Sequence, residues 1–147
     1  RRILIHEKVL MKERSVFAAA SKSGLSTEEI RLLQNAGCHG LYGMHLTELK
    51  RHKGLTLTNR SLLDFMCEDE LLANYFRLNR LEIKLKSCGM RSQRVAENEA
   101  RVTGGFIRNS MIKNSGFWPE NFELVEDIRK VKASLQQIRL EMKTKVL

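Results

Sequence analysis

Proline and aromatic residues are scarce in this sequence, and their scarcity favours helices. Only one of the 147 residues is proline, at Pro119, and aromatic residues make up 6%. Runs of β-branched residues are also few, whereas Leu, Glu, Lys, Arg and Ala predominate. The hydrophobic fraction of 42% is enough for one domain with a modest core. We therefore expect an all-α fold, a helical bundle.

Cysteine and long apolar runs are limited as well. Cys38, Cys67 and Cys88 show no Cys-x-x-Cys spacing, so we expect no disulfide framework and a reducing, cytoplasmic environment. No apolar run approaches the roughly 18 residues of a membrane span, and no signal peptide opens the chain, so we expect no membrane partner. The sequence begins with Arg1 rather than Met, as a processed product, a fragment or a trimmed chain would.

Hydrophobic periodicity divides the chain into helices separated by glycines. A capping box, Ser26 with Glu29, starts the second helix, and Gly37 is expected to stop it. The stretch Gln34–Gly54 then predicts a Gly-rich turn in the middle of the bundle. Gly104 and Gly105 predict either close packing of two helices or a hinge. We expect helices over residues 1–22, 26–36, 47–53, 59–66, 68–86, 91–111 and 121–145.

The last of these helices carries a heptad seam. Its apolar residues are spaced alternately four and three apart, which is typical of a helix that pairs with another helix. We expect a homodimer or a partner helix, and docking of the helix onto the bundle is the alternative. This divides the chain into a helical domain, 1–120, and a C-terminal helix, 121–147. The seam consists of Leu124, Ile128, Val131, Leu135, Ile138 and Met142.

The net charge of +9 favours an acidic partner, most often nucleic acid. Nine basic and three acidic residues fall within 77–113. Arginines spaced three, seven and seven residues apart within 91–111 share one arc of about 100° on a helix. We expect Val95, Val102, Phe106 and Ile107 to form the dry face on the opposite side of that helix.

A row of guanidinium groups can follow a phosphate backbone, because each forms paired hydrogen bonds to phosphate oxygens. A solvated face of an ordinary amphipathic helix, or contact with an acidic protein groove, would fit the same pattern. A basic turn and the preceding long helix supply further cations. The candidate contacts to nucleic acid or an acidic partner are Arg91, Arg94, Arg101, Arg108, Lys50, Arg51, Lys53, Arg77, Arg80 and Lys84.

No catalytic or metal-binding pattern rises above chance. The cluster of Cys38, His39, His45 and His52 matches no zinc module in its spacing. Cys38 and His39 are adjacent, so their side chains usually point apart and do not form a dyad. We therefore expect no metal, no cofactor and no enzymatic activity.

Several motifs together resemble the C-terminal half of the bacterial DNA damage-inducible protein D family, over about residues 1–120. The resemblance implies a non-catalytic bacterial or phage protein of the DNA damage (SOS) response, associated with the RecA recombinase, whose DNA filaments such proteins destabilise or restrain. The motifs are QNAGCHGLYG (Gln34–Gly43), HKGL (His52–Leu55), LLDFM (Leu62–Met66), ELLANYFR (Glu70–Arg77), EIKL (Glu82–Leu85), the pair Gly104 and Arg108, and Pro119–Glu120.

The sequence departs from the family pattern in two ways. The N-terminal region of the family, similar to the Bro domain of phage and virus regulators, is lacking here, so its function is expected to be absent or supplied by another chain. Gly105 and Phe106 stand where similar proteins place basic residues, which weakens any contact made there.

The leading hypothesis is a non-enzymatic DNA damage response protein that binds DNA, a RecA-type filament or both, and modulates recombination. The alternatives are a small phage or plasmid DNA-binding transcriptional regulator, dimerised by its C-terminal helix, and a structural subunit of a larger assembly.

Overall fold

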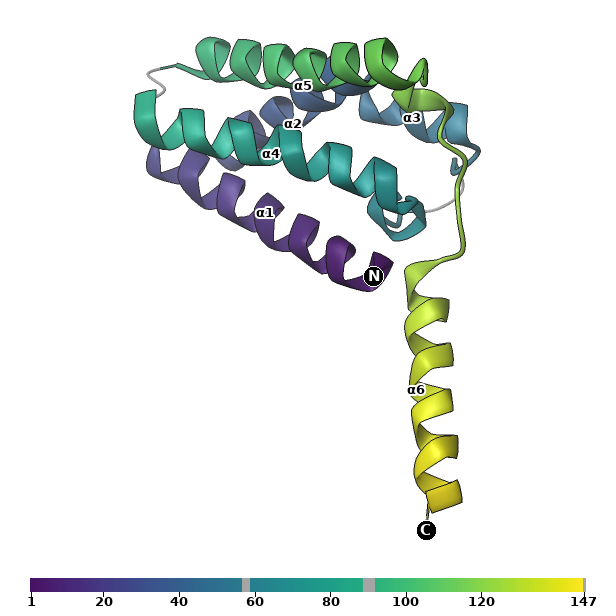
Figure 1. Ribbon diagram of the computed structural model, residues 1–147. Helices are drawn as coiled ribbons and strands as arrows, with labels where there is room; N and C mark the ends of the chain where they lie inside the picture. Colours follow the sequence, from purple (N-terminus) through teal and green to yellow (C-terminus); the bar gives the residue numbers. More distant parts are fainter. Residues whose placement is uncertain (57–58, 89–91, 147) are drawn as a thin grey trace.

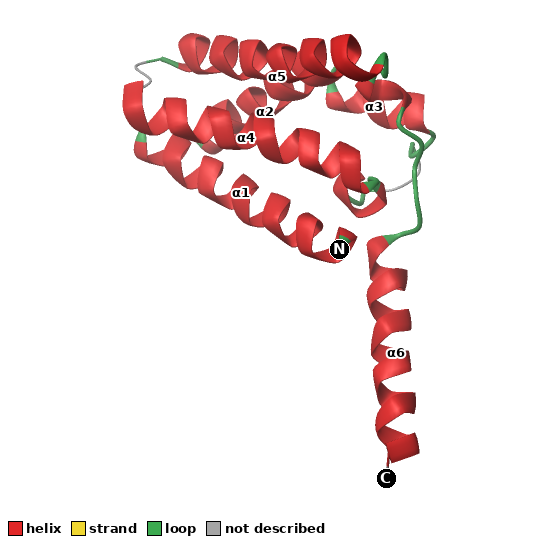
Figure 2. Cartoon of the chain, in the orientation of Figure 1, coloured by secondary structure: helices red, strands yellow, loops and turns green. Residues whose placement is uncertain are grey.

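The computed structural model describes residues 1–56, 59–88 and 92–146, and within these ranges the protein is all helix and loop (Figures 1 and 2). The expected all-α bundle is thus confirmed. The elements are α1 (Arg2–Lys22), α2 (Thr27–Tyr42), α3 (Leu46–Lys53), the 3₁₀ helix η1 (Leu62–Phe65), α4 (Glu68–Cys88), α5 (Gln93–Ser115), the 3₁₀ helix η2 (Pro119–Asn121) and α6 (Ile128–Val146).

Four long helices surround one core. α1 packs on α4, α4 on α5, α5 on α2 and α2 on α1, so that α1 and α5 lie on opposite sides of the bundle (Figure 1). Val9, Ile30, Leu41 and Leu71 are almost fully buried in the centre. The expected capping box is confirmed, because the Ser26 side chain accepts from the backbone N–H of Glu29 and the Glu29 carboxylate accepts from that of Ser26.

The Gly-rich stretch is largely helix rather than turn. α2 continues through Gly37 and Gly40 and ends only at Gly43, whose φ of 72° suits glycine. The prediction that Gly37 stops this helix was therefore wrong. A Cβ on Gly40 would overlap the carbonyl oxygen of Arg101, and one on Gly104 would lie 2.7 Å from the backbone nitrogen of Leu41. Of the two roles open to the Gly104–Gly105 pair, the structure therefore shows close helix packing at Gly104.

α6 projects away from the bundle (Figure 1). It starts at Ile128 rather than at residue 121, and Leu124 lies before it in the connector segment (residues 116–127), partly buried against the core. Ile128 is only 1% exposed and α6 contacts η1, whereas Leu135, Ile138 and Met142 are 45%, 50% and 62% exposed. The predicted seam thus begins at Ile128, and its outer half lies open along the arm.

Paired side chains fasten the connector segment to the bundle. The Arg60 guanidinium donates to Asp127 at 2.6 Å and to Asp64 at 2.8 Å, and the backbone N–H of Val125 donates to the carbonyl of Phe65 at 2.9 Å.

Of the helices described, none is both long and apolar enough to cross a membrane.

Candidate functional site

The outer surface of α5 is the first candidate, because it holds most of the expected arginine row. α5 buries Ala96, Ala100, Thr103 and Gly104, so its small residues face the bundle. Val95, Val102 and Phe106 are 49%, 53% and 52% exposed, and of the expected dry face only Ile107 is partly buried. The expectation was wrong because α5 approaches α2 at glycine and alanine, which leaves no space there for larger side chains.

Arg94 and Arg101 are exposed on this surface. Neither forms an ion pair with any residue that the structure describes. Seven residues separate them, so they lie on one side of α5, about 10.5 Å apart along its axis. Arg91, the first member of the predicted row, lies outside the described residues.

Arg108 has a different environment, since its side chain is only 17% exposed. It donates to both carboxylate oxygens of Glu120, at 2.6 and 3.0 Å, and to the carbonyl of Leu41 at 3.1 Å. Burial opposes ionisation of Glu120, but the hydrogen bonds and charge of Arg108 outweigh burial and lower its pKa below the usual value. Arg108 therefore anchors the connector segment instead of extending into solvent.

The three cations expected on one side of α4 divide between two environments. Arg80 lies over the ring of Phe106, at 4.4 Å from its centroid, and Lys84 pairs with Glu99 at 2.6 Å, so both face α5. Arg77 instead lines an internal pocket. In the basic turn Arg51 is exposed, whereas the side chain of Lys53 is only 2% exposed and pairs with Glu70 at 2.5 Å.

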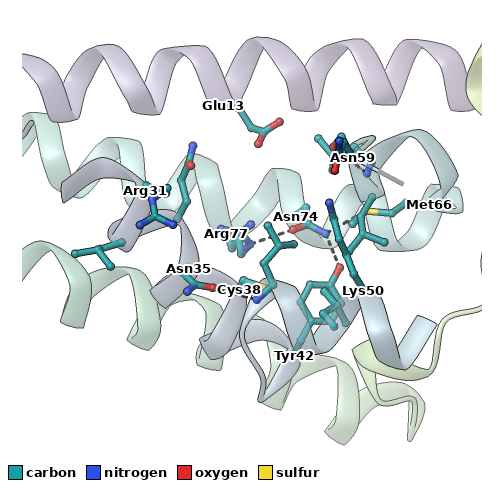
Figure 3. Close-up of a pocket in the computed structure, with 17 residues that line it drawn as sticks. Glu13, Arg31, Asn35, Cys38, Tyr42, Lys50, Asn59, Met66, Asn74 and Arg77 are labelled. Carbon is teal, nitrogen blue, oxygen red and sulfur yellow. Dashed lines mark hydrogen bonds between the residues drawn. The ribbon is translucent and has the colours of Figure 1, made fainter. Parts of the chain in front are cut away.

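The internal pocket is the second candidate. It has a volume of about 410 Å³ and lies between α1, α2, α3, η1 and α4, with Lys50 among its lining residues (Figure 3). Arg77 donates to Asn74 at 3.1 Å, and Asn74 in turn donates to the Tyr42 hydroxyl at 2.9 Å and to the Glu70 carbonyl at 3.0 Å. A chain of hydrogen bonds thus joins α2 and α4 inside the bundle.

This network of hydrogen bonds was not predicted from the sequence, although the sequence contains a signal for it. Glu70, Asn74 and Arg77 follow at i, i+4 and i+7, so three polar residues share one side of a helix with the buried Leu71 and Leu78. Polar residues at that period next to a core predict a buried network that satisfies itself.

The ionisable groups of the pocket are held in forms that do not suit nucleophilic chemistry. Burial raises the pKa of Cys38 to about 11, so the thiol stays protonated near neutral pH, and it donates to the carbonyl of Met44 at 3.6 Å. Burial raises the pKa of Glu13, whose carboxyl points toward the pocket (Figure 3), and the positive charge of Arg77 offsets only part of this effect. Neither group is therefore poised as a nucleophile or a general base near neutral pH.

The histidines of the central stretch are distributed between two places. The rings of His39 and His45 lie 4.9 Å apart, and the Nε2 of His52 lies 3.3 Å from the side-chain oxygen of Asn121. Within the described ranges, no three His, Cys, Asp or Glu side chains gather as metal ligands would.

The protein is thus an all-α helical bundle. It carries outward arginines on α5, an internal polar network and a projecting arm. Residues 1–131 match the family described as the DinD C-terminal domain, and the chain belongs to this family. The expected resemblance is confirmed, and the match extends past residue 120 into the first turn of α6.

The chain is also similar to DNA damage-inducible protein D of Escherichia coli (strain K12). The two are 30% identical over 122 residues, which cover 82% of this chain and 44% of that protein. The chain thus spans less than half the length of this curated relative. No solved structure matches the chain.

Proposed function

We propose that this is a non-enzymatic protein of the DNA damage response that binds DNA, a RecA-type filament or both, and modulates recombination in the cytoplasm. Its family and its similarity to a DNA damage-inducible protein support a role in the DNA damage response. The binding of DNA or of a filament is supported by Arg94 and Arg101, which are exposed and have no ion-pair partners among the described residues.

The chemistry of these arginines suits phosphate. A guanidinium that is already paired with a carboxylate must lose that partner before it can bind a phosphate, whereas Arg94 and Arg101 need not. Lys53 and Arg108 are paired with Glu70 and Glu120, which leaves them out of the proposed contact surface. An acidic groove on a protein filament would attract the same two side chains, so the filament is included in the test.

The test compares two double variants with the same change in charge. Arg94→Glu with Arg101→Glu reverses the α5 cations, and Arg14→Glu with Lys22→Glu reverses two exposed cations of α1, on the far side of the bundle. Binding to labelled single-stranded DNA, with and without a preformed RecA-type filament, is measured at two salt concentrations. We expect the α5 variant to lose binding and the α1 variant to retain most of it. Equal behaviour of the two variants would contradict the proposal.

α6 supports a second candidate role, self-association or attachment to a partner helix. Leu135, Ile138 and Met142 are about half exposed on a helix that projects from the bundle, so their apolar seam has no cover within the part of the chain that the structure describes. We propose a homodimer through α6, in which two seams cover each other.

A further inference from the structure

We infer that Trp118 is a base-stacking residue, and that with Arg94 and Arg101 it forms a site selective for single-stranded nucleic acid. This inference rests on the proposed function and specifies which ligand the α5 surface binds. Trp118 is 48% exposed, so about half of this large aromatic side chain is accessible to a ligand.

Neighbouring residues hold the indole of Trp118 in place. The Arg108 guanidinium lies over the ring, 5.0 Å from its centroid, and is itself fixed by two hydrogen bonds to Glu120. Pro119, the next residue, is buried and starts η2, which restricts the backbone at Trp118. A ring that is already oriented loses little conformational freedom when a base stacks on it.

The ring lies at the end of the arginine row. Arg94, Arg101 and Arg108 occupy the same side of α5 at intervals of about 10.5 Å, and the third of them lies over Trp118. A strand whose phosphates follow the two exposed arginines is thereby led to the indole. Cationic contacts to the backbone, combined with an aromatic surface for a base, are the features by which proteins bind single strands without reading sequence.

Strand selectivity follows from the ring rather than from the arginines. Phosphates are available in single strands and duplexes alike, so Arg94 and Arg101 contribute to both. The bases of a duplex are already stacked on one another, and only an unpaired base can cover Trp118 without the cost of opening base pairs. We therefore expect Trp118 to raise the affinity for single strands and to leave the affinity for duplexes unchanged.

The experiment uses the full chain and the fact that Trp118 is the only tryptophan. Its fluorescence is followed during titration with a short mixed-sequence DNA strand and with the same strand annealed to its complement. In parallel, binding of the labelled strands is measured for Trp118→Ala, Trp118→Phe and the control Phe17→Ala, which removes a 41% exposed ring from α1.

We expect the single strand, but not the duplex, to quench Trp118. Trp118→Ala should weaken single-strand binding by about fivefold to 100-fold, the usual effect of losing one stacked base. Trp118→Phe should retain most of the affinity, and Phe17→Ala and all duplex affinities should be unchanged. Retention by Trp118→Phe also shows that the connector segment folds without the indole.

Two results would overturn the inference, and they differ in what they say of the proposed function. If the reversal of Arg94 and Arg101 abolishes binding while Trp118→Ala and the fluorescence show no effect, the stacking role is wrong and the phosphate contacts stand. If the unaltered protein binds the filament but neither form of DNA, the surface recognises protein, and Trp118 is not a stacking residue.

Discussion

At the scale of single residues, Gly104 and Gly105 differ sharply although they are adjacent. A Cβ on Gly104 would lie 2.7 Å from the nitrogen of Leu41 and 2.8 Å from the carbonyl oxygen of Gly37, whereas one on Gly105 would meet only the Gly40 carbonyl at 4.0 Å. Gly104→Ala should therefore lower the free energy of unfolding by about 1–3 kcal/mol or more, because α2 and α5 must separate.

Gly105→Ala is the matched control. Alanine is a better helix former than glycine and finds space at this position, so the free energy of unfolding should stay the same or rise by up to about 1 kcal/mol. Urea unfolding of the two variants measures the difference. Equal losses in both would show that the helix crossing does not depend on Gly104.

Glu13 gives a prediction with a pH dependence. Burial raises the pKa of Glu13 in the folded protein above its value in the unfolded chain, so ionisation of this carboxyl opposes folding. The penalty is present above the folded pKa and disappears below the unfolded one. Glu13→Gln should therefore raise the free energy of unfolding at about pH 7 and leave it unchanged at about pH 3.5, where the unfolded carboxyl is mostly protonated.

Urea unfolding at the two pH values is the measurement. A loss of stability for Glu13→Gln at the higher pH would mean that the attraction between Glu13 and Arg77 outweighs the cost of burial.

At the scale of elements, Arg108 links α5 to the connector segment. Arg108→Gln removes the charged hydrogen bonds to Glu120 and should cost about 2 kcal/mol of unfolding free energy. Since the cation over the indole is also lost, the fluorescence of Trp118 should shift to longer wavelength as the ring becomes more hydrated. Arg101→Gln, at an exposed position of α5, should change the stability by less than about 0.5 kcal/mol.

α6 allows its proposed pairing to be separated from folding. Leu135→Ser with Ile138→Ser should abolish the dimer while leaving the bundle as stable as before, because both side chains project into solvent along the arm. Leu140→Ser is the control, since Leu140 is 55% exposed on another side of the helix. Sedimentation equilibrium gives the masses. A monomer before any substitution would rule out pairing through the seam.

The same elements show which parts of the fold can be predicted from sequence patterns. Helix periodicity and capping residues predicted α1, α3 and α4 closely, because these signals are local. Glycine is a poor helix former, so Gly37 was predicted to end the helix, but α2 meets the backbone of α5 at Gly40, and a Cβ on Gly37 would lie 2.7 Å from the Arg77 guanidinium. These contacts come from tertiary packing and leave no local pattern.

The candidate site was predictable only in part, for the same reason. Spacing placed Arg94, Arg101 and Arg108 on one side of a helix, as the structure does. It could not show that Glu120, beyond a turn, would pair with Arg108, or that Glu70 would bury Lys53. Which cations remain open to solvent depends on contacts between elements, and spacing within one helix carries no information about them.

At the scale of the whole molecule, charge predicts how binding responds to salt. Each phosphate contact to a single strand releases counterions, and the logarithm of the affinity falls with the logarithm of salt by about 0.7 per contact. Arg94→Gln with Arg101→Gln should therefore reduce the steepness by about 1.4, whereas Arg14→Gln with Lys22→Gln should not change it. Fluorescence anisotropy over a series of salt concentrations measures the slope. An unchanged slope for the α5 variant would show that neither arginine contacts phosphate.

The motifs that carry the family resemblance lie mostly in the interior. Gly40 and Gly104 form the helix crossing, Asn74 and Arg77 belong to the internal network, and Glu120 anchors the connector segment. Family membership therefore describes how this chain folds, while Arg94 and Trp118, on which the proposals depend, lie outside those motifs.

The projecting arm has a consequence for binding strength. α6 has 19 residues, so it spans about 28 Å. If two arms pair along their seams, two bundles are tethered to one rod, and both α5 surfaces can engage the same long polymer. Once one bundle has bound, the effective concentration of the other near the strand is high. The dimer therefore dissociates far more slowly than a single bundle would, without any new contact. The affinity for long strands would then exceed that for short ones and depend on the concentration of the protein itself.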